Sequence, residues 1–324
     1  MNAILVPLDG SALAEQVLPS VRQLAPLLGA EVHLLHVVTE ADRYHLLFDD
    51  PRSVGEFDEV ISASLPKAGS AVATQRAPAQ TSWDVLRLNA SNYLADQAEK
   101  LQAAGITTNF EVVTGLAAEV IADVAEKLHV RLIAMATHGY SGLRRWALGS
   151  VADKVLHVTK APMLLVRGNE RMLAPTSAFK RILLPLDGSD CARQAIPLAV
   201  DLAKRTQAEL VALTVVAPPY LQTPEVIGPY LQYEEAIEVV RDRLGAELKG
   251  YADELKQAGV TLSPCAISGL PAEAIIDEAI DRGTDLIVMA THGASGLRRW
   301  ALGSVADKVL HATNTPLLLV RAQE

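Results

Sequence analysis

One stretch that occurs twice constrains this chain more than any other feature of its sequence. Residues 135–157 and 289–311 are identical except that Tyr140 in the first copy becomes Ala294 in the second. Each stretch begins in a short apolar run and ends in a pattern of helical periodicity, which predicts a strand, a glycine-bearing loop and a helix that starts at Gly-Ser. Such a loop exposes backbone N–H groups, and the helix N-terminus adds partial positive charge. The stretch is therefore a candidate anion site.

The repetition extends over the chain and predicts its domain organisation. The motif Ile-Leu-Val-Pro-Leu-Asp-Gly-Ser at 4–11 returns 178 residues later as Ile-Leu-Leu-Pro-Leu-Asp-Gly-Ser, whereas from Ala104 onward the offset is 154. The chain is therefore two copies of one domain, the first longer by 24 residues. We predict a first domain at 1–168 with an insertion at about 39–82, a linker at 169–179 and a second domain at 180–324.

Apolar runs of strand length alternate with helical patterns in each copy. The first copy is predicted to have strands at 3–8, 31–38, 107–113, 131–136 and 162–167, and helices at 12–28, 83–104, 117–128 and 150–159. The second copy repeats the strands near 181–186, 209–216, 260–267, 285–290 and 316–321. Continuous apolar strands separated by helices indicate a parallel sheet covered on both faces. The predicted fold is α/β, with two tandem doubly wound, Rossmann-like domains, each a five-stranded parallel sheet flanked by helices.

The insertion at 39–82 has no counterpart of equal length in the second copy. Loops of this length are usually either functional covers or segments without fixed structure. Two alternatives stay open, namely a disordered segment or passive surface excursion, and a lid over the site of the first copy.

Charge and composition exclude some classes of protein. A formal net charge of −9 and a pI near 5.4 argue against a general nucleic-acid binder. Cys191 and Cys265 lie in different predicted elements and suggest no disulfide framework, which fits a reducing compartment. The N-terminus enters a strand directly, and no run approaches about 18 apolar residues, so we expect neither a signal peptide nor a membrane span. The expected location is the cytoplasm.

The candidate site is predicted where the strands end beside the glycine loops. In an open α/β sheet, ligands bind outside the carboxyl ends of the strands, where the strand order reverses. If strands one and four are central neighbours, Asp9 faces the loop at 137–150, and Asp187 faces the loop at 291–304. A carboxylate opposite N–H donors suits a sugar hydroxyl plus phosphates, or a phosphate-bound Mg²⁺. Taken alone, Asp9-Gly10-Ser11 is better explained as a helix N-cap. The glycine loop beside it favours a nucleotide.

The glycine loops also have a structural explanation, because glycine serves tight turns and close packing. Phosphate binding is favoured by the Gly-Ser at the start of the following helix, at 149–150 and again at 303–304. His138 and His292 lie in the loops, where a phosphate contact and a turn-capping role explain them equally well.

The sequence supports no catalytic assignment. His33 and His36 lie three apart in a predicted strand, so they point to opposite faces and cannot chelate one metal ion. We find no Ser–His–Asp arrangement, no paired carboxylates of defined geometry, no Cys-x-x-Cys and no P-loop motif.

Together these motifs resemble those of the universal stress protein family. The resemblance is carried by the opening motif, by the loop His-Gly-x-Ser-Gly-Leu…Leu-Gly-Ser-Val-Ala, and by the closing Pro-x-Leu-Leu-Val-Arg at 162–167 and 316–321. It covers both copies almost from end to end, apart from the insertion and the linker. It implies a tandem universal stress protein with a fold like that of the adenine nucleotide alpha hydrolases.

The resemblance also implies a set of binding residues. The ATP-binding branch of the family has a glycine, two residues, a second glycine, nine residues, and then Gly-Ser or Gly-Thr. In this chain alanine replaces the first glycine, and we expect it to be tolerated because it is small and supplies the same N–H. Asp9 and Asp187 are implied on the ribose or metal side, and backbone near 37–38 and 215–216 at the adenine edge. The implied cofactor-binding residues are Pro7, Asp9, Val37, Val38, Ala136, His138, Gly139, Gly142, Gly149, Ser150 and Val151 in the first copy, and Pro185, Asp187, Val215, Val216, Ala290, His292, Gly293, Gly296, Gly303, Ser304 and Val305 in the second.

The expected function is that of an ATP-binding stress-response sensor or interaction module. AMP and ADP are alternative ligands, and Mg²⁺ is expected to be held through phosphates and the two aspartates rather than by protein alone. The last strands of the two copies are expected to pair within the chain as a pseudo-dimer. A homodimer and an unidentified protein partner are further expected associations. We expect the protein to bind neither nucleic acid nor a membrane. Two alternatives stay open: a slow ATPase or phosphoryl or nucleotidyl transferase, for which only His138 or His292 is a candidate, and a nucleotide-free scaffold.

Overall fold

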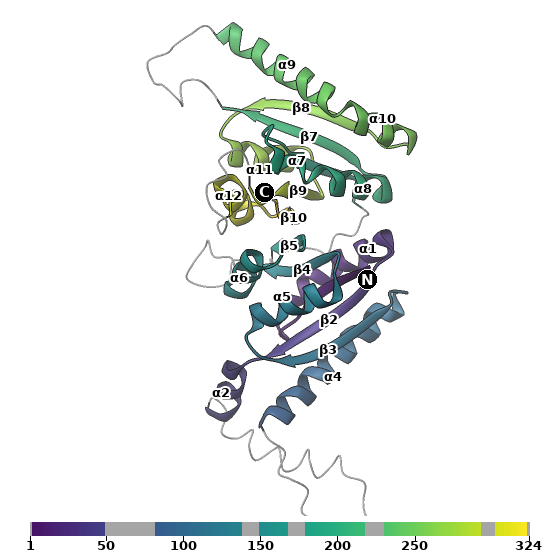
Figure 1. Ribbon diagram of the computed structural model, residues 1–324, viewed down its shortest axis with the longest axis vertical. Helices are drawn as coiled ribbons and strands as arrows, with labels where there is room; N and C mark the ends of the chain where they lie inside the picture. Colours follow the sequence, from purple (N-terminus) through teal and green to yellow (C-terminus); the bar gives the residue numbers. More distant parts are fainter. Residues whose placement is uncertain are drawn as a thin grey trace, which may run out of the picture.

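One ten-stranded sheet runs through both copies of the repeat (Figure 1). The computed structural model describes residues 2–48, 82–137, 149–167, 179–217, 230–292 and 302–322. Its strands are β1 (Ala3–Pro7), β2 (Glu31–Val38), β3 (Thr108–Thr114), β4 (Leu132–Thr137), β5 (Met163–Arg167), β6 (Arg181–Pro185), β7 (Glu209–Val216), β8 (Leu262–Ser268), β9 (Leu286–Ala290) and β10 (Leu317–Val320). Their order in the sheet is β3-β2-β1-β4-β5-β10-β9-β6-β7-β8.

Each half of the sheet is parallel, and the halves join through an antiparallel pair, β5 and β10. In the first half β1 pairs with both β2 and β4, and in the second half β6 pairs with both β7 and β9. At the junction Leu318 is opposite Leu164. The predicted five-stranded parallel sheets, the central position of strands one and four, and the pairing of the last strands within the chain are confirmed.

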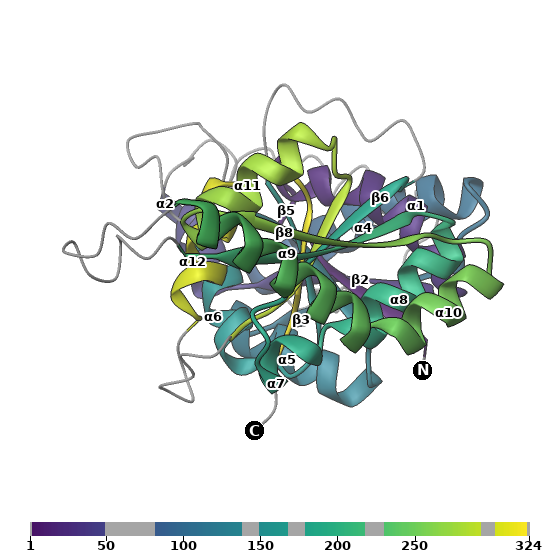
Figure 2. The same ribbon diagram turned by 90° about the horizontal axis from the view of Figure 1, so that it is seen from above.

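Helices cover both faces of this sheet. In the first copy they are the 3₁₀ turn η1 (Ala14–Val17) and helices α1 (Leu18–Leu28), α2 (Glu40–Phe48), α4 (Ser82–Ala103), α5 (Ala117–Leu128) and α6 (Ser150–Val158). In the second copy they are α7 (Asp190–Arg193), α8 (Ile196–Thr206), α9 (Tyr230–Glu247), α10 (Lys249–Gln257), α11 (Pro271–Asp281) and α12 (Ser304–Ala312). Seen from above, the strands cross one another in projection, as expected for a sheet whose strands each rotate relative to their neighbours (Figure 2).

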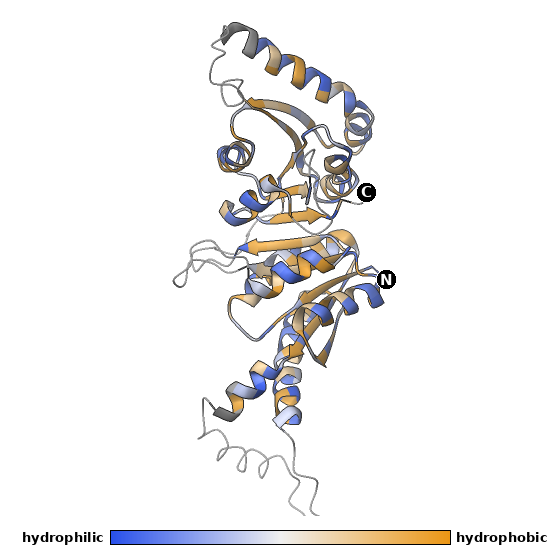
Figure 3. Cartoon of the chain, turned by 60° about the vertical axis from the view of Figure 1, so that its left-hand side comes forward, coloured by the Kyte–Doolittle hydropathy of each residue, from blue (hydrophilic) through white to orange (hydrophobic). Residues whose placement is uncertain are grey.

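The alternation of side chains along the strands divides the core into two layers. Ile4 and Val6 of β1 face one side of the sheet with α1, α4 and α8, whereas Leu5 faces the other side with α5, α6, α11 and α12. Each layer contains residues from both copies, so the cores are continuous across the junction. In Figure 3 the strands are mostly hydrophobic and the helices carry hydrophilic residues along one side. Among the described residues, no helix combines the length and the apolar composition needed to cross a membrane.

The predicted helix at 12–28 is wrong in its first turns. It is divided into η1 and α1, with Pro19 in the first turn of α1. Proline lacks the N–H that would donate to the carbonyl of Glu15, and that carbonyl instead accepts from Leu18 in a tighter turn. The second copy is divided in the same way, into α7 and α8, with Pro197 in the first turn of α8.

The insertion begins with a helix that the sequence analysis did not predict. Thr39 and Asp42 cap α2 reciprocally: the backbone N–H of Thr39 donates to Asp42 Oδ2 at 2.7 Å, and the N–H of Asp42 donates to Thr39 Oγ1 at 3.3 Å. Arg43 then holds α2 against α4, through a hydrogen bond to Ser82 Oγ of 3.2 Å and a contact over the ring of Trp83. Residues 49–81 lie outside the described residues, as does the proposed linker except at its last residue. The choice between a lid and a surface excursion therefore stays a prediction.

Candidate functional site

Each copy has a pocket at the carboxyl end of its parallel strands. Pocket one, in the first copy, has a volume of about 290 Å³, and pocket two, in the second copy, about 260 Å³. Pocket one is lined by Pro7, Leu8, Asp9, Ser11, Leu13, Ala14, Leu35, Val37, Ala117, Ile121, Met135, Ala136, Gly149, Ser150, Val151 and Ala152. Pocket two is lined by Pro185, Leu186, Asp187, Ala192, Leu213, Val215, Pro271, Ile275, Met289, Ala290, Thr291, His292, Gly303, Ser304, Val305 and Ala306. The repeat therefore places equivalent elements around two equivalent pockets.

An aspartate in a tight turn forms one wall of each pocket. Asp9 Oδ1 accepts a hydrogen bond of 2.9 Å from the N–H of Ser11, whose Oγ accepts one of 3.1 Å from the N–H of Ala14. Asp187 and Ser189 repeat this arrangement, with distances of 3.0 and 3.1 Å. The capping explanation of these residues is thus correct, and it does not remove them from the site. In each turn one oxygen of the aspartate accepts a backbone hydrogen bond, and this bond fixes the orientation of the exposed carboxylate at the pocket.

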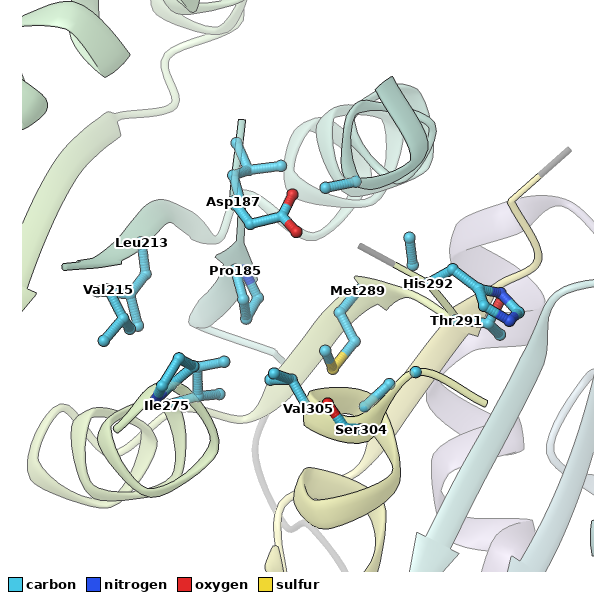
Figure 4. A pocket seen from close by; sticks show the side chains of 16 residues that line it. Pro185, Asp187, Leu213, Val215, Ile275, Met289, Thr291, His292, Ser304 and Val305 are labelled. Carbon is cyan, nitrogen blue, oxygen red and sulfur yellow. The ribbon is translucent and has the colours of Figure 1, made fainter. Parts of the chain in front are cut away.

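The opposite wall is the N-terminus of a helix. Helices α6 and α12 begin directly after Gly149 and Gly303, and within the described part of the chain no side chain caps either start. The first N–H groups of a helix have no partner within the helix, so they are available to a ligand. Figure 4 shows the carboxylate of Asp187 facing Ser304, at the start of α12, across pocket two.

A second helix N-terminus borders each pocket. Ala117 and Pro271 are the first residues of α5 and α11, and both line their pockets. Leu116 and Leu270, at the N-cap positions, make no side-chain capping bond among the described residues. Two helix dipoles therefore direct partial positive charge toward one space, which favours an anion there.

Between these polar ends each pocket is apolar. Leu35 and Val37 of β2, Ile121 of α5 and Met135 of β4 form this part of pocket one. In pocket two the same part is formed by Leu213, Val215, Ile275 and Met289. The arrangement suits a ligand with an anionic end and a flat apolar body.

Two of the predicted residues do not line the pockets. Val38 is 1% exposed, and its carbonyl accepts a hydrogen bond of 3.1 Å from the N–H of Gly115. Val216 accepts in the same way from Gly269, at 3.2 Å. Because successive side chains of a strand point to opposite faces, Val37 and Val215 face the pockets and their neighbours do not.

The other predicted site residues fall into two groups. Those that line the pockets are Pro7, Asp9, Val37, Ala136, Gly149, Ser150 and Val151, and Pro185, Asp187, Val215, Ala290, His292, Gly303, Ser304 and Val305. Those outside the described residues are His138, Gly139, Gly142, Gly293 and Gly296. His292 Nδ1 lies 3.0 Å from Thr291 Oγ1, and its buried Nε2 has no hydrogen-bond partner among the described residues.

Most of the apolar lining of the pockets was not predicted from the sequence. The spacing of Ala117 and Ile121 places both on one face of a helix, and Leu35 shares a strand face with Val37, so local patterns contained part of the signal. Met135 lies near the end of the apolar run of β4, and the sequence does not show which neighbours it meets.

A cluster of polar residues lies on the face of the sheet opposite pocket one. His36 follows Leu35 in β2 and packs edge-on against Tyr93 of α4, with ring centroids 6.3 Å apart. The Tyr93 hydroxyl donates to Glu15 at 3.1 Å, and Gln97 donates to the same carboxylate at 3.2 Å. Burial lowers the pKa of His36 below its usual value, and the charges of Asp42 and Asp9 and the carbonyl of Leu8 oppose this effect. The second copy has Thr214 in place of His36, and its hydroxyl donates to Leu186 at 3.0 Å.

We expect this histidine to make the protein less stable as the pH falls below about 6.5. The pKa of His36 is lower in the folded chain than in the unfolded chain, so between the two values the unfolded chain binds more protons and acidification favours unfolding. His36→Thr introduces the residue found at the equivalent position of the second copy. In this variant the urea concentration at the midpoint of unfolding should fall less between about pH 7.5 and about pH 5.5 than in the unsubstituted protein. The hydrogen bond from Arg181 is the main cause of the lowered pKa of Glu209, and this group changes the stability of the protein only at lower pH. An identical pH dependence in the variant would contradict this assignment.

Protein side chains alone do not form a metal site in the part of the chain that the structure describes. No group of three or more His, Cys, Asp or Glu side chains there is placed to hold a metal ion. A cation at Asp9 or Asp187 would therefore need further oxygen ligands from a bound molecule.

Comparison with known proteins identifies what the chain is similar to. The sequence model of the universal stress protein family matches residues 1–167 and again 178–321. Universal stress protein YxiE of Bacillus subtilis (strain 168) is 34% identical over 147 residues, which is 44% of this chain and 99% of the relative. A universal stress protein of Thermus aquaticus is 37% identical over 145 residues, 44% of this chain and 99% of its own length. Each of these relatives thus corresponds to about one copy of the repeat.

One solved structure matches both copies together. It is the crystal structure of a universal stress protein from Archaeoglobus fulgidus DSM 4304, with a TM-score of 0.64 and 22% sequence identity. The match covers 100% of this chain and 97% of that one. At this identity the likeness concerns the fold, including the arrangement of two domains in one chain.

Proposed function

The chain belongs to the universal stress protein family, and on that premise we propose that each of its two pockets binds an adenine nucleotide, with ATP as the principal ligand. The observation that carries this proposal is the polarity of the pockets. In both copies a fixed carboxylate and two uncapped helix N-termini surround a slot whose remaining wall is apolar. A nucleotide has the matching parts in the same molecule: ribose hydroxyls, phosphates and a flat base.

Each part of the pocket has a role in this proposal. Asp9 and Asp187 accept hydrogen bonds from ribose hydroxyls, as acidic residues do in other doubly wound folds. The N–H groups at the starts of α6 and α12 donate to phosphate oxygens. The apolar residues of β2, β4 and α5, and their counterparts in the second copy, pack against adenine. Mg²⁺ would take its ligands from phosphate oxygens and an aspartate, and would neutralise phosphate charge.

We further propose that the protein acts in the cytoplasm as a nucleotide-loaded sensor or interaction module in a stress response. A ligand that binds the native state better than other states shifts the population toward it. Occupancy of the pockets would then change which surfaces a partner protein meets. The domain limits proposed above, 1–168 and 180–324, give each domain its own pocket.

The test is to denature the purified protein and to measure the released nucleotide per chain by chromatography. We expect about two equivalents of adenine nucleotide, or, for protein purified empty, a higher thermal midpoint when Mg·ATP is added. At a ligand concentration 100-fold above Kd the stabilisation is about 2.7 kcal/mol per site. Protein that neither releases nucleotide nor responds to Mg·ATP would favour the scaffold alternative, and steady ATP turnover that His292→Ala abolishes would favour the enzyme.

A further inference from the structure

We propose that Arg321, in the second copy, is a positioning residue for pocket one and couples the two pockets to each other. This inference rests on the proposed function, since it concerns ligand affinity at the same pockets. Arg321 follows β10 directly, and its guanidinium crosses the junction into the first copy.

The guanidinium of Arg321 holds the far end of the helix that opens pocket one. Its Nη1 donates to the carbonyl of His157 at 2.9 Å and to the carbonyl of Thr159 at 2.6 Å. These carbonyls lie at the C-terminus of α6, where the last carbonyls have no partner within the helix and where the dipole favours a cation. A helix of this length spans about 13 Å. A side chain of the second copy thus fixes the helix whose first turn lines pocket one.

The backbone on both sides of Arg321 is held by a residue of pocket two. The N–H of Thr291 donates to the carbonyl of Val320 at 2.9 Å, and the N–H of Ala322 donates to Thr291 Oγ1 at 3.4 Å. Thr291 lines pocket two beside His292, whose Nδ1 lies 3.0 Å from Thr291 Oγ1 (Figure 4). A hydrogen-bonded path therefore runs from pocket two, through Thr291 and Arg321, to α6 and pocket one.

His292 gives this path a contact that depends on the ligand. Thr291 and His292 both line pocket two, and His292 Nδ1 lies 3.0 Å from Thr291 Oγ1. A ligand that packs against these two residues restricts Thr291 and, through it, the backbone next to Arg321. Occupancy of pocket two then reduces the motion of the anchor of α6, so pocket one loses less entropy when it binds its own ligand. The expected coupling is positive.

An equivalent contact leads from the first copy into the second. Arg167 occupies the equivalent position after the repeat offset, and its Nη1 donates to the carbonyl of Thr313, at the end of α12, at 3.4 Å. The coupling of binding free energies between two sites is reciprocal whichever route carries it.

The experiment measures Mg·ATP affinity at pocket one by calorimetry in a double-mutant cycle of Arg321→Ala and Ser304→Asp. Ser304→Asp blocks pocket two with a negative charge at the start of α12, and we expect it to lower the affinity of pocket one about five-fold through lost coupling. Arg321→Ala should lower that affinity by about three- to ten-fold. In the double variant Ser304→Asp should add little, because the path is already broken.

Two further variants separate positioning from a general loss of stability. Arg205→Ala removes a different contact between the copies, the hydrogen bond of 3.1 Å to the carbonyl of Leu27, on the α1–α8 side and away from both pockets. It should leave the affinity of pocket one and the coupling unchanged. Arg321→Lys keeps a cation that can donate to the same carbonyls, so it should retain part of the affinity of pocket one and part of the coupling between the pockets. If Arg321→Ala does not fold, Arg321→Lys takes its place in the experiment.

The outcomes distinguish this inference from the function on which it rests. Two pockets that bind Mg·ATP independently, or an Arg321→Ala protein with the affinity of Arg205→Ala, would overturn the coupling and leave nucleotide binding in place. Failure of the unsubstituted protein to bind Mg·ATP would overturn both.

Discussion

Ser150→Asp is expected to remove nucleotide binding at pocket one while slightly raising the stability of the folded protein. Ser150 is an exposed residue at the start of α6, and no side chain among the described residues caps this helix. An aspartate there interacts favourably with the helix dipole, by about 0.3–1 kcal/mol. It also accepts from the N–H groups proposed to bind phosphate, and it repels the phosphate charge.

The expected loss of affinity is large. If two charge-assisted hydrogen bonds of roughly 1.5–3 kcal/mol each are lost, the affinity falls by at least about 100-fold. Calorimetric titration with Mg·ATP should then give one site per chain in place of two. Thermal unfolding without ligand should give a midpoint equal to or above that of the unsubstituted protein.

Matched variants make this test specific. Ser304→Asp places the same charge at pocket two, and the two variants together should bind no nucleotide. Ser150→Asn introduces a side chain of nearly the same shape as aspartate without its charge and should retain most of the affinity. A Ser150→Asp protein that still binds two equivalents would show that the start of α6 is not the phosphate site.

The second large effect is expected at the junction of the two copies. Leu318 in β10 is 2% exposed and lies opposite Leu164 in β5, which is fully buried. Truncation of a buried leucine to alanine removes its transfer free energy and leaves a cavity, at a cost of about 2–5 kcal/mol. Leu318→Ala should lower the free energy of unfolding by this amount in urea denaturation.

The same experiment tests whether the copies unfold together. Because both core layers continue across the junction, we expect a single transition for the unsubstituted chain. Ile280→Ala is the control, since Ile280 is 68% exposed on α11 and its truncation should change stability by less than about 0.5 kcal/mol. A loss below about 1 kcal/mol for Leu318→Ala would mean that the junction contributes little to stability.

Much of the fold could be predicted because the chain carries its signals locally. The strand at 31–38 and the helix at 117–128 were predicted to the residue, since their apolar periodicity is uninterrupted. The errors are local as well. Pro19 divides the helix predicted at 12–28, and the Thr39–Asp42 capping pair starts a helix that was missed.

The candidate site was predictable where a motif defines it. Asp9 and the Gly-Ser at 149–150 were found from the turn and helix-start signals of the sequence, and the structure places them on opposite walls of one pocket. Ile121 and Met135 were not found, because their place in the pocket depends on how a helix packs on a distant strand. Val38 was implied through its backbone at the adenine edge, and it is not among the residues that line pocket one.

The sequence by itself determined the duplication, the order of the strands along the chain, and the position of one candidate anion-binding helix start in each copy. These properties follow from periodicity and turn chemistry over a few residues. Only the tertiary structure decided the antiparallel register of β5 and β10, the apolar lining of the pockets, and the reach of Arg321 to the end of α6. The pairing of β5 with β10 and the contact of Arg321 with α6 each join residues more than a hundred positions apart. Local sequence patterns do not specify such contacts, because they do not show which surfaces meet when the chain packs its core.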